Sequence, residues 1–420
     1  MSISSSDIHT SPGLRREFLG LTGDLWRLAV ATGISQFSMS IWAWRFGVFM
    51  QDHLTEEFQM GATYTAGTVA LLFGFYASGM ASDLIGRRRT MIVAFLPMVA
   101  GLSGMTLFPV WPAIPLFYAM AQCGWSFVLI ITRAMPADVI AAQQATDAPR
   151  KFMLVLLPAF VADGLSPLIA GAMISAGTNA DTLMLIGAVM AIIGMISVIV
   201  MVHESLDKKI MERARRGPVL TFKGVGPNFW KLVVGMVPFY FCFNMVIGYL
   251  GNLCVFEWGV TDVEYAQTWS AFSFTSALLM YSASELVNRN RRAALLFSVI
   301  AESTIFVLFA LGSGLAMMFA LNIAWALPIV MWGGAERSLV AEGAVKEMQG
   351  RTLGSFTFIM SSTGLVAPIV GQWVWITTGS LRTLYLVAGI MGLVVSVPLA
   401  ILLATLRRVG RESEANQNAS

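Results

Sequence analysis

Charged residues are scarce in this sequence. Only 12% of its 420 residues are Asp, Glu, Lys or Arg, whereas 56% are hydrophobic. A soluble globular domain carries about twice that share of charge, and a soluble chain of this length would divide into two or three domains, each with a polar surface. The charges present cannot cover such surfaces. The composition therefore excludes a soluble protein and indicates a chain whose solvent is largely lipid.

Cysteine and histidine are also rare, with three residues of each. The cysteines fall in apolar runs, which excludes a disulfide framework, and the histidines fall in separate polar segments, which leaves no clustered metal ligands. The sequence lacks a phosphate-binding loop of the Walker type and lacks a nucleophile grouped with a base. We therefore expect no cofactor, no metal site and no enzymatic activity.

Long apolar runs occupy most of the chain. A helix needs roughly 20 mainly apolar residues to cross a bilayer core of about 30 Å, and in lipid the backbone must satisfy its own hydrogen bonds, so such runs form helices. The runs predict an all-α membrane protein with twelve transmembrane helices. The expected spans are 28–50, 62–82, 90–108, 113–132, 152–174, 182–202, 230–255, 266–287, 293–311, 316–334, 353–376 and 381–406.

The Lys and Arg residues predict the orientation of these spans. With a cytoplasmic N-terminus, all but Arg45 and Arg382 of the 27 Lys and Arg residues lie in cytoplasmic segments, as the positive-inside rule requires. We therefore expect a multi-pass protein of the cell membrane with both termini in the cytoplasm. The same rule explains the basic clusters, so we expect lipid as their neighbour and no nucleic-acid partner.

The longest internal polar stretch divides the predicted spans into two sets of six. This stretch, 203–228, is rich in Lys and Arg and predicts a cytoplasmic linker. The expected organisation is an N-terminal segment 1–27, a six-helix bundle 28–202, the linker 203–228, a second six-helix bundle 229–406 and a tail 407–420.

The two halves also carry an internal repeat with an offset of roughly 200 residues. The segment 79–89 (GMASDLIGRRR) aligns with 281–291 (YSASELVNRNR), and Arg133 aligns with Arg337. Because six is an even number of spans, both copies enter the membrane from the same side. Parallel repeats of this kind are a transporter architecture in which the substrate site lies near the membrane midplane.

The pattern Gly79-x-x-x-Asp83-x-x-Gly86-Arg87-Arg88-Arg89 resembles the signature that the major facilitator superfamily carries between its second and third helices. The resemblance extends to the twelve spans, the basic linker and the degenerate second copy. It implies two pseudo-symmetric six-helix bundles and secondary active transport of a small-molecule substrate by alternating access. We expect the chain to act as a monomer.

The resemblance also implies a gate at this segment. A glycine at position 79 allows another helix to approach closely, and Asp83 can face the N-terminus of span eleven, where unpaired N–H groups favour negative charge. Glu285 would make the equivalent contact with the start of span five. The alternative is that these charges only set the topology. The predicted gating residues are Gly79, Asp83, Gly86, Arg87, Arg89, Glu285, Arg289 and Arg291.

In this family, spans one, four, seven and ten line the central cavity. Polar and aromatic side chains in these spans can hydrogen-bond a solute, although any one of them could instead bond a neighbouring helix. The candidate substrate-binding residues are Gln36, Arg45, Gln122, Trp125, Tyr240, Asn244, Asn322 and Trp325.

Two carboxyl groups lie deep inside predicted spans. Asp163 is about 18 Å along span five from Lys151, at 1.5 Å per residue, and Glu302 lies similarly deep in span nine. Ionisable groups inside a membrane are costly and mark functional sites, so both are candidates for proton coupling. The alternatives are a structural hydrogen bond for Asp163 and a contact with a neighbouring helix or partner for Glu302.

The sequence leaves the solute open. Arg45 could attract an anion or lie in an interfacial belt beside Trp42 and Trp44, and with the polar cavity residues it favours a polar or anionic metabolite. The segment 166–171 (SPLIAG) loosely resembles an element of drug–proton antiporters, which favours export of amphiphiles, but those antiporters carry an arginine where this chain has Ala119. A third alternative is a membrane scaffold or sensor that has lost transport.

Overall fold

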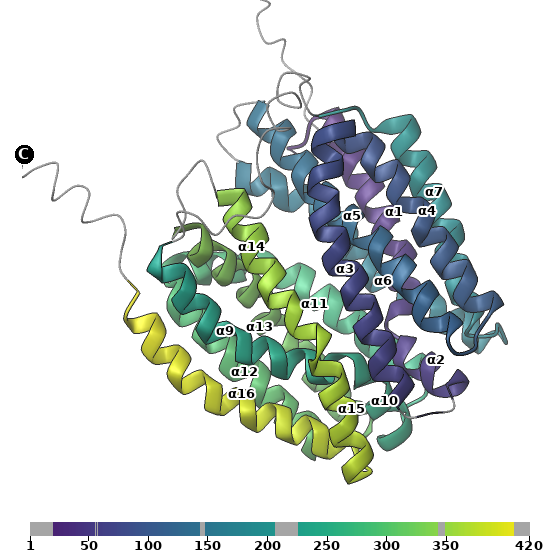
Figure 1. Cartoon of the computed structure of the whole chain (residues 1–420), viewed down its shortest axis with the longest axis vertical. Coiled ribbons are helices and arrows are strands. Elements are labelled where there is room, and N and C mark those ends of the chain that lie inside the picture. Colours follow the sequence, from purple (N-terminus) through teal and green to yellow (C-terminus); the bar gives the residue numbers. More distant parts are fainter. Residues whose placement is uncertain are drawn as a thin grey trace, which may run out of the picture.

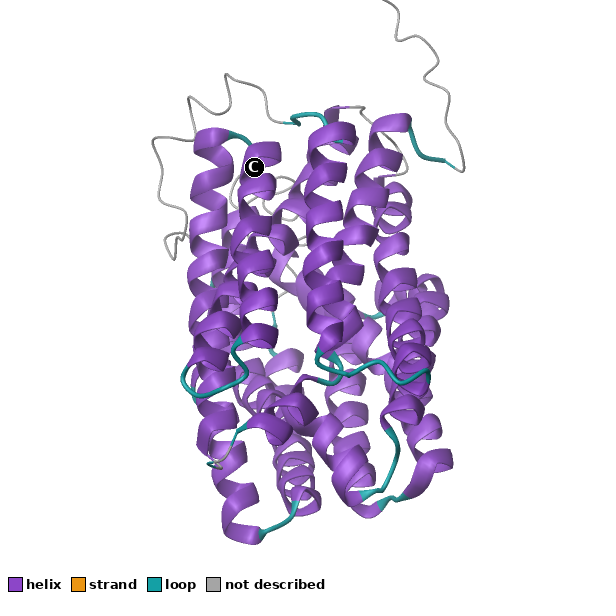
Figure 2. Ribbon diagram, turned by 90° about the vertical axis from the view of Figure 1, so that its right-hand side faces the viewer, coloured by secondary structure: helices purple, strands orange, loops and turns teal. Residues whose placement is uncertain are grey.

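The computed structural model describes residues 20–54, 56, 58–142, 148–205, 226–342 and 349–406. Within these ranges the chain consists of helices and loops, with no strand (Figure 2). Nine of the described helices are long and apolar enough to cross a membrane by length and composition. The long helices α1 (Gly23–Ala43), α3 (Phe58–Ile85) and α11 (Asp262–Arg289) are not among these nine. Of these, α3 and α11 contribute polar groups to the contact between the two halves, and α1 supplies hydrogen-bond donors to Asp163 of its own half.

Six helical segments make up the first half. The first segment is divided into α1 and α2 because the backbone turns at Trp44 and Arg45, and five continuous helices follow it. These elements are α1, α2 (Phe46–His53), α3, α4 (Arg87–Leu107), α5 (Ala113–Ala142), α6 (Ala148–Ser175) and α7 (Thr182–Met201).

The second half repeats this order, again with a broken first segment. That segment contains α9 (Pro227–Val246), the 3₁₀ turn η1 (Ile247–Tyr249), α10 (Leu250–Asn252) and the π turn η2 (Leu253–Glu257). The remaining segments are α11, α12 (Arg291–Leu311), α13 (Gly314–Glu342), α14 (Gln349–Ser362) continued by η4 (Thr363–Leu365) and α15 (Ala367–Thr378), and α16 (Leu381–Ala404).

The predicted all-α membrane fold is therefore confirmed, with corrections at its boundaries. The first helix starts at Gly23, inside the predicted segment 1–27, and predicted span ten stops at 334 although α13 continues to Glu342. The two additional turns place Glu336 and Arg337 on a helix. Most of the predicted linker and the whole predicted tail lie outside the described residues.

The buried apolar side chains show how the halves meet. We call the end at which α1 begins and α16 finishes the terminal end, and the other end the distal end. One core of buried residues runs through the first half and continues into the distal part of the second half, whereas a separate core fills the terminal part of the second half. Among the described residues, the halves thus share a hydrophobic core at the distal end only.

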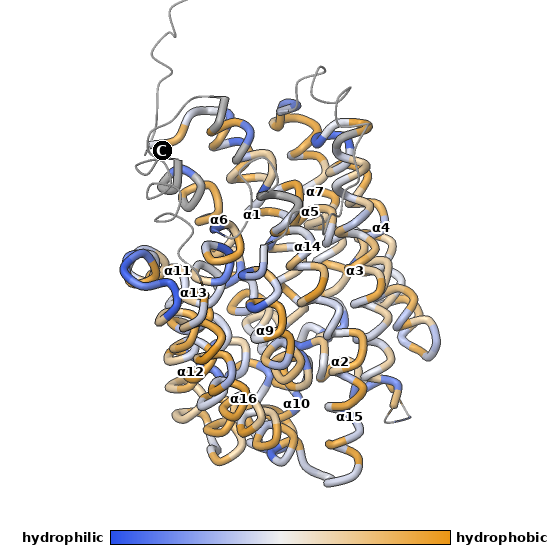
Figure 3. Tube along the Cα trace, turned by 60° about the vertical axis from the view of Figure 1, so that its left-hand side comes forward, coloured by the Kyte–Doolittle hydropathy of each residue, from blue (hydrophilic) through white to orange (hydrophobic). Residues whose placement is uncertain are grey.

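The figures agree with this distribution. In Figure 1, α2, α10 and α15 lie together at the distal end, while α3 and α14 diverge toward the terminal end. Figure 3 shows hydrophobic residues along most of α12 and α16, and hydrophilic residues concentrated at the terminal end of α11.

Candidate functional site

A cavity of about 330 Å³ lies between the halves in the middle of the protein. The first half lines it with α1, α2, α3, α5 and α6, and the second half closes it with η1, α10 and α11. Among the described lining residues, Asp163 is the one charged group. Much of the remaining wall is aromatic, with Trp42, Phe46, Tyr64, Tyr118, Trp125, Tyr265 and Trp269.

Asp163 accepts hydrogen bonds from both halves of the protein. On α1, Gln36 Nε2 donates to Asp163 Oδ1 at 3.2 Å, and Ser40 Oγ donates to the same oxygen. On α11, Ser273 Oγ donates to Asp163 Oδ2 at 2.7 Å. All three partners are neutral, so the carboxyl group connects the halves without an ion pair.

Three of the predicted substrate-binding residues line this cavity. Gln36, Gln122 and Trp125 all belong to its wall, and Gln122 Nε2 donates to the Tyr118 hydroxyl at 2.8 Å. Tyr118 in turn stacks on Phe46, with ring centroids 4.3 Å apart. The first half therefore supplies a polar amide pair within an aromatic wall.

Four predicted substrate-binding residues of the second half do not belong to this lining. Asn244 Nδ2 donates to Thr363 Oγ1 at 2.8 Å, Asn322 Nδ2 donates to the Met318 carbonyl at 3.0 Å, and Tyr240 donates to Glu336 at 2.8 Å. Trp325 packs edge-on against Phe306. These side chains lie within the second bundle because that half meets the cavity through its broken first segment and α11.

Arg45 lies at the distal end, outside the cavity lining. Its Nε is 3.0 Å from Asp262 Oδ2 of the second half, and its Nη2 is 3.2 Å from Asp52 Oδ2 of the first half. The side chain is only 11% exposed. In this conformation both carboxylates engage the guanidinium, so Arg45 connects the halves instead of facing a bound solute.

Other polar contacts close the distal end beside Arg45. Asn252 Nδ2 donates to the Gly47 carbonyl at 3.0 Å and to Gln51 Oε1 at 2.6 Å, and the Tyr64 hydroxyl donates to the Gly248 carbonyl. A Cβ atom at Gly47 would overlap Asn252 and the Gly248 carbonyl. Glycine is therefore required where the two broken segments cross.

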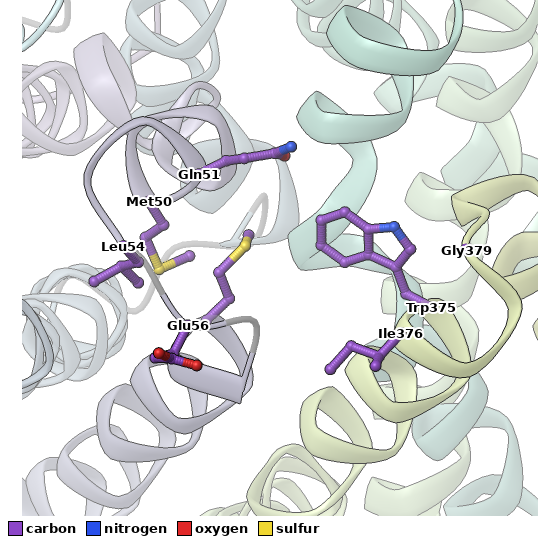
Figure 4. A pocket seen from close by; sticks show the side chains of 8 residues that line it. Met50, Gln51, Leu54, Glu56, Trp375, Ile376 and Gly379 are labelled. Carbon is purple, nitrogen blue, oxygen red and sulfur yellow. The ribbon is translucent and has the colours of Figure 1, made fainter.

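A smaller pocket lies at the distal end, between α2 and α15. It has a volume of about 240 Å³. Figure 4 shows Gln51 and Trp375 pointing toward each other from the two sides of this pocket. Since Gln51 also bonds Asn252, the pocket lies next to the contacts that hold the halves together.

At the terminal end, the predicted gating segment is tied to its own half. Gly86 has φ 93° at the start of α4, a conformation that favours glycine. The Arg87 and Arg88 backbone N–H groups donate to the Glu204 carboxylate at 3.0 and 3.1 Å, and Arg87 Nη1 is 2.9 Å from Asp138 Oδ2. Gly79 is half-buried on α3 and Arg89 is exposed.

The second copy of the segment makes parallel contacts within the second half. Arg291 pairs with Glu342, while Arg289 pairs with Glu285 on its own helix at 2.9 Å. Glu285 is 59% exposed in this pair. The Asp83 side chain lies outside the described residues, so its predicted contact with span eleven stays a prediction, as does the contact of Glu285 with span five.

Glu302 is fully buried on α12, and neither carboxyl oxygen has a hydrogen-bond partner among the described residues. The Trp325 indole and the Glu336 carboxyl group lie near it. Glu336 is 7% exposed and accepts hydrogen bonds from Tyr240 at 2.8 Å and from Trp332 Nε1 at 3.3 Å. The sequence reasoning missed Glu336, because it assigned that residue to a loop.

The sequence also gave little indication of Ser40 and Ser273, the hydroxyl partners of Asp163. Both are serines in helices that contain several others. To find them, one would have to know which faces of α1 and α11 are turned toward Asp163. Within the described ranges, no group of three His, Cys, Asp or Glu residues could hold a metal ion.

Comparison with known proteins accounts for this arrangement. A family model described as Major Facilitator Superfamily matches residues 28–368. The chain belongs to this superfamily. It is therefore a multi-pass membrane protein and a secondary transporter. No curated protein matches the sequence.

Solved transporters of this superfamily have a similar fold. A mutant of the nucleoside transporter NupG is similar with a TM-score of 0.78 at 13% identity, over 90% of this chain and 99% of NupG. The human organic anion transporter MFSD10 gives a TM-score of 0.64 at 13% identity, over 90% and 98% of the two chains. A POT family transporter in complex with 5-aminolevulinic acid gives 0.73 at 11% identity, over 93% and 98%. At these identities the likeness shows the fold alone.

Proposed function

We propose that this superfamily member moves a small polar solute by alternating access, coupled to protons through Asp163. This proposal rests on one observation. Asp163, the one charged residue among the described residues of the cavity lining, accepts hydrogen bonds from α1 of its own half and from α11 of the other half. A group in that position senses both the content of the cavity and the contact between the halves. Transport requires these two events to be coupled.

The coupling follows from the hydrogen bonds of Asp163. Ser40, Ser273 and the Gln36 amide all donate to it, and an ionised carboxylate is acceptor-only. A bound proton would convert one oxygen into a donor and remove an acceptor, so one of these bonds must break or reverse. A proton on Oδ2, the oxygen that accepts from Ser273, would thus weaken or reverse the one hydrogen bond between Asp163 and α11. Glu302 is a second proposed proton carrier, with Glu336 as its neighbour.

We propose that the terminal end faces the cytoplasm and that the protein resides in the cell membrane. The support is the distribution of Lys and Arg, since Arg45 and Arg382 both lie at the distal end. In this orientation the structure corresponds to an inward-facing conformation. Gly79, Asp83, Glu285 and the arginines beside them would join the halves in the opposite conformation. We also propose that one chain suffices for transport.

A second candidate, export of amphiphiles, is favoured by one observation. An apolar groove of about 470 Å³ lies between α3 and the segment α14–η4, lined by Val69, Leu72, Phe73, Tyr76, Phe358 and Leu365. Such a groove would suit an apolar molecule that arrives from lipid. The two candidates differ in solute polarity and in the direction of transport.

Transport into proteoliposomes tests the proposal. Vesicles that contain the purified protein receive a proton gradient and a mixture of metabolites, and mass spectrometry identifies solutes that accumulate relative to protein-free vesicles. We expect a polar solute to accumulate, and we expect both a protonophore and Asp163→Asn to abolish this. The matched control, Asp181→Asn, changes an aspartate that pairs with His53 at the distal end and should keep transport.

Each contrary outcome has a defined meaning. Accumulation that persists in Asp163→Asn removes Asp163 from coupling. Accumulation of lipid-soluble solutes alone favours the second candidate. Wild-type vesicles that behave like protein-free vesicles contradict the transport proposal and favour a scaffold or sensor.

A further inference from the structure

Two arginines occupy equivalent positions in the two halves. Arg133 on α5 and Arg337 on α13 are separated by 204 residues (337 − 133), the offset of the internal repeat. Both side chains are exposed to solvent. Both helices belong to the class that lines the cavity in this superfamily.

Arg133 lies on the cavity side of α5. It follows Gln122, a cavity-lining residue, by 11 residues (133 − 122), which is about three helical turns, so both side chains point in nearly the same direction. The rise per residue places Arg133 roughly 16 Å nearer the terminal end. It is surrounded by protein on most sides although solvent reaches it. The described halves share no hydrophobic core at this end, and we call the solvent-reached space between them the vestibule.

The two guanidinium groups act on each other across the vestibule. Arg337 is the charged group whose repulsion is felt at Arg133, and the two residues belong to different halves. Neither has an ion pair or hydrogen bond with any residue in the described part of the chain. The other arginines near helix ends behave differently, since Arg45, Arg87 and Arg291 each pair with a carboxylate.

The carboxylate beside Arg337 in the sequence is already engaged by other groups. Glu336 adjoins Arg337 in the sequence, but it faces α9, where Tyr240 donates to it, and it also accepts from Trp332 on its own helix. Two like charges in a vestibule of reduced dielectric repel each other. An anion between them would remove this repulsion and accept several charge-assisted hydrogen bonds.

We propose that Arg133 and Arg337 form a two-arginine site for the oxyanion group of the transported solute, a carboxylate or a phosphate. The planar guanidinium fork matches both groups and can bind either in bidentate fashion. The proposal deepens the proposed function, because its ligand is the transported solute. An anion bound to one arginine from each half would also bridge the halves at the terminal end. Binding would thereby favour closure of that end, as alternating access requires.

Binding to the purified full-length protein tests the site without transport. Thermal unfolding is followed in inorganic phosphate, in succinate and in potassium chloride at equal ionic strength. We expect phosphate or succinate to stabilise the wild-type protein more than chloride, and the better of the two identifies the oxyanion. Arg133→Gln and Arg337→Gln should each weaken that effect about tenfold or more in apparent affinity, since each removes charge-assisted bonds.

The controls separate a specific site from general charge. Arg27→Gln removes an exposed arginine of the terminal end and should leave the anion effect intact, and Arg133→Lys should restore part of it. Unfolding of each variant in chloride alone shows whether it folds. Where a variant does not fold, titration of wild-type intrinsic tryptophan fluorescence with both anions provides the second measurement.

Several results would overturn the site. One is equal stabilisation of the wild-type protein by chloride and both oxyanions, with no saturable change of fluorescence. Another is an equal loss of the anion effect in Arg27→Gln and Arg133→Gln. Failure of the site can be distinguished from failure of the proposed function. Anion binding without any accumulation in vesicles retains the site and rejects transport. Full transport by both glutamine variants retains transport and rejects the site.

Discussion

The ion pair between Arg45 and Asp262 allows a quantitative test of how the distal end is held closed. Arg45 Nε lies 3.0 Å from Asp262 Oδ2, and the two side chains are 11% and 21% exposed. Two unit charges about 4 Å apart attract by about 4 kcal/mol at an effective dielectric constant of 20. Desolvation of both groups offsets much of this, so a net value of about 1–2 kcal/mol is reasonable for a charged hydrogen bond in this setting.

Only the conformation that is closed at the distal end contains this pair. Asp262→Asn should therefore shift the equilibrium toward the conformation that is open there, by roughly 5- to 30-fold. Asp262 also lies in the first turn of α11, where a negative charge stabilises the helix. That contribution is present in both conformations and cancels.

Asp52 provides the matched control. Its carboxylate also contacts Arg45, at 3.2 Å, but both residues belong to the first half and move together. Asp52→Asn makes the same chemical change beside the same arginine without removing a contact between the halves. It should leave the equilibrium close to that of the wild-type protein.

Distance measurements between two spin labels would read this equilibrium. Labels at the exposed distal residues Ala176 and Ser313 report one half each, once the three native cysteines have been replaced by alanine. We expect Asp262→Asn to increase the population of long distances and Asp52→Asn to leave it unchanged. Equal distributions in the two variants would refute the role of the pair in closing the distal end.

Three further predictions use the same protein preparations. Gly47→Ala should increase the long-distance population and reduce transport at least about tenfold, because the new methyl group overlaps Asn252. The control Gly23→Ala, with nothing within 4 Å of the added atom, should change neither the distances nor transport. Glu302→Gln should raise the thermal midpoint, because it removes a buried ionisable group that lacks partners in the described structure; a lower midpoint would mean that the carboxylate has one. Asp138→Asn should destabilise the protein by about 1 kcal/mol through loss of the ion pair with Arg87. Glu285→Gln should destabilise it less, because its pair with Arg289 is exposed. A larger loss of thermal stability in Glu285→Gln than in Asp138→Asn would contradict the assigned geometry.

The fold could be predicted because its signals are long and redundant. Apolar runs of sufficient length, the basic linker and the repeat of segment 79–89 all indicate the same architecture. The interruptions within spans were not predictable. The break at Trp44–Arg45 and the turns at 247–257 depend on where the halves cross, and no local sequence pattern contains that information.

The site was predictable only in part. Asp163 is conspicuous as an ionisable group within an apolar run, and Gln36, Gln122 and Trp125 lie on spans that the family resemblance indicates. Arg45 shows why the rest was missed, since its two partners, Asp52 and Asp262, lie 7 and 217 residues away (52 − 45 and 262 − 45) and on different halves. Tertiary contacts of that kind decide whether a charge faces a solute or a gate.

The internal repeat separates two kinds of functional residue. Gene duplication places equivalent residues in both halves, and Arg133 with Arg337 retains that equivalence. Asp163 does not: an offset of about 200 residues reaches Thr363 and Gly364, in the turn η4, and neither is a carboxylate. A group that must meet a solute from both sides, or bridge the halves on their pseudo-symmetry axis, gains from being duplicated. A proton-coupling group must instead distinguish one half from the other. Because Asp163 has no counterpart in the second half, its protonation can change the contact between α6 and α11 without changing the equivalent contact of the second half.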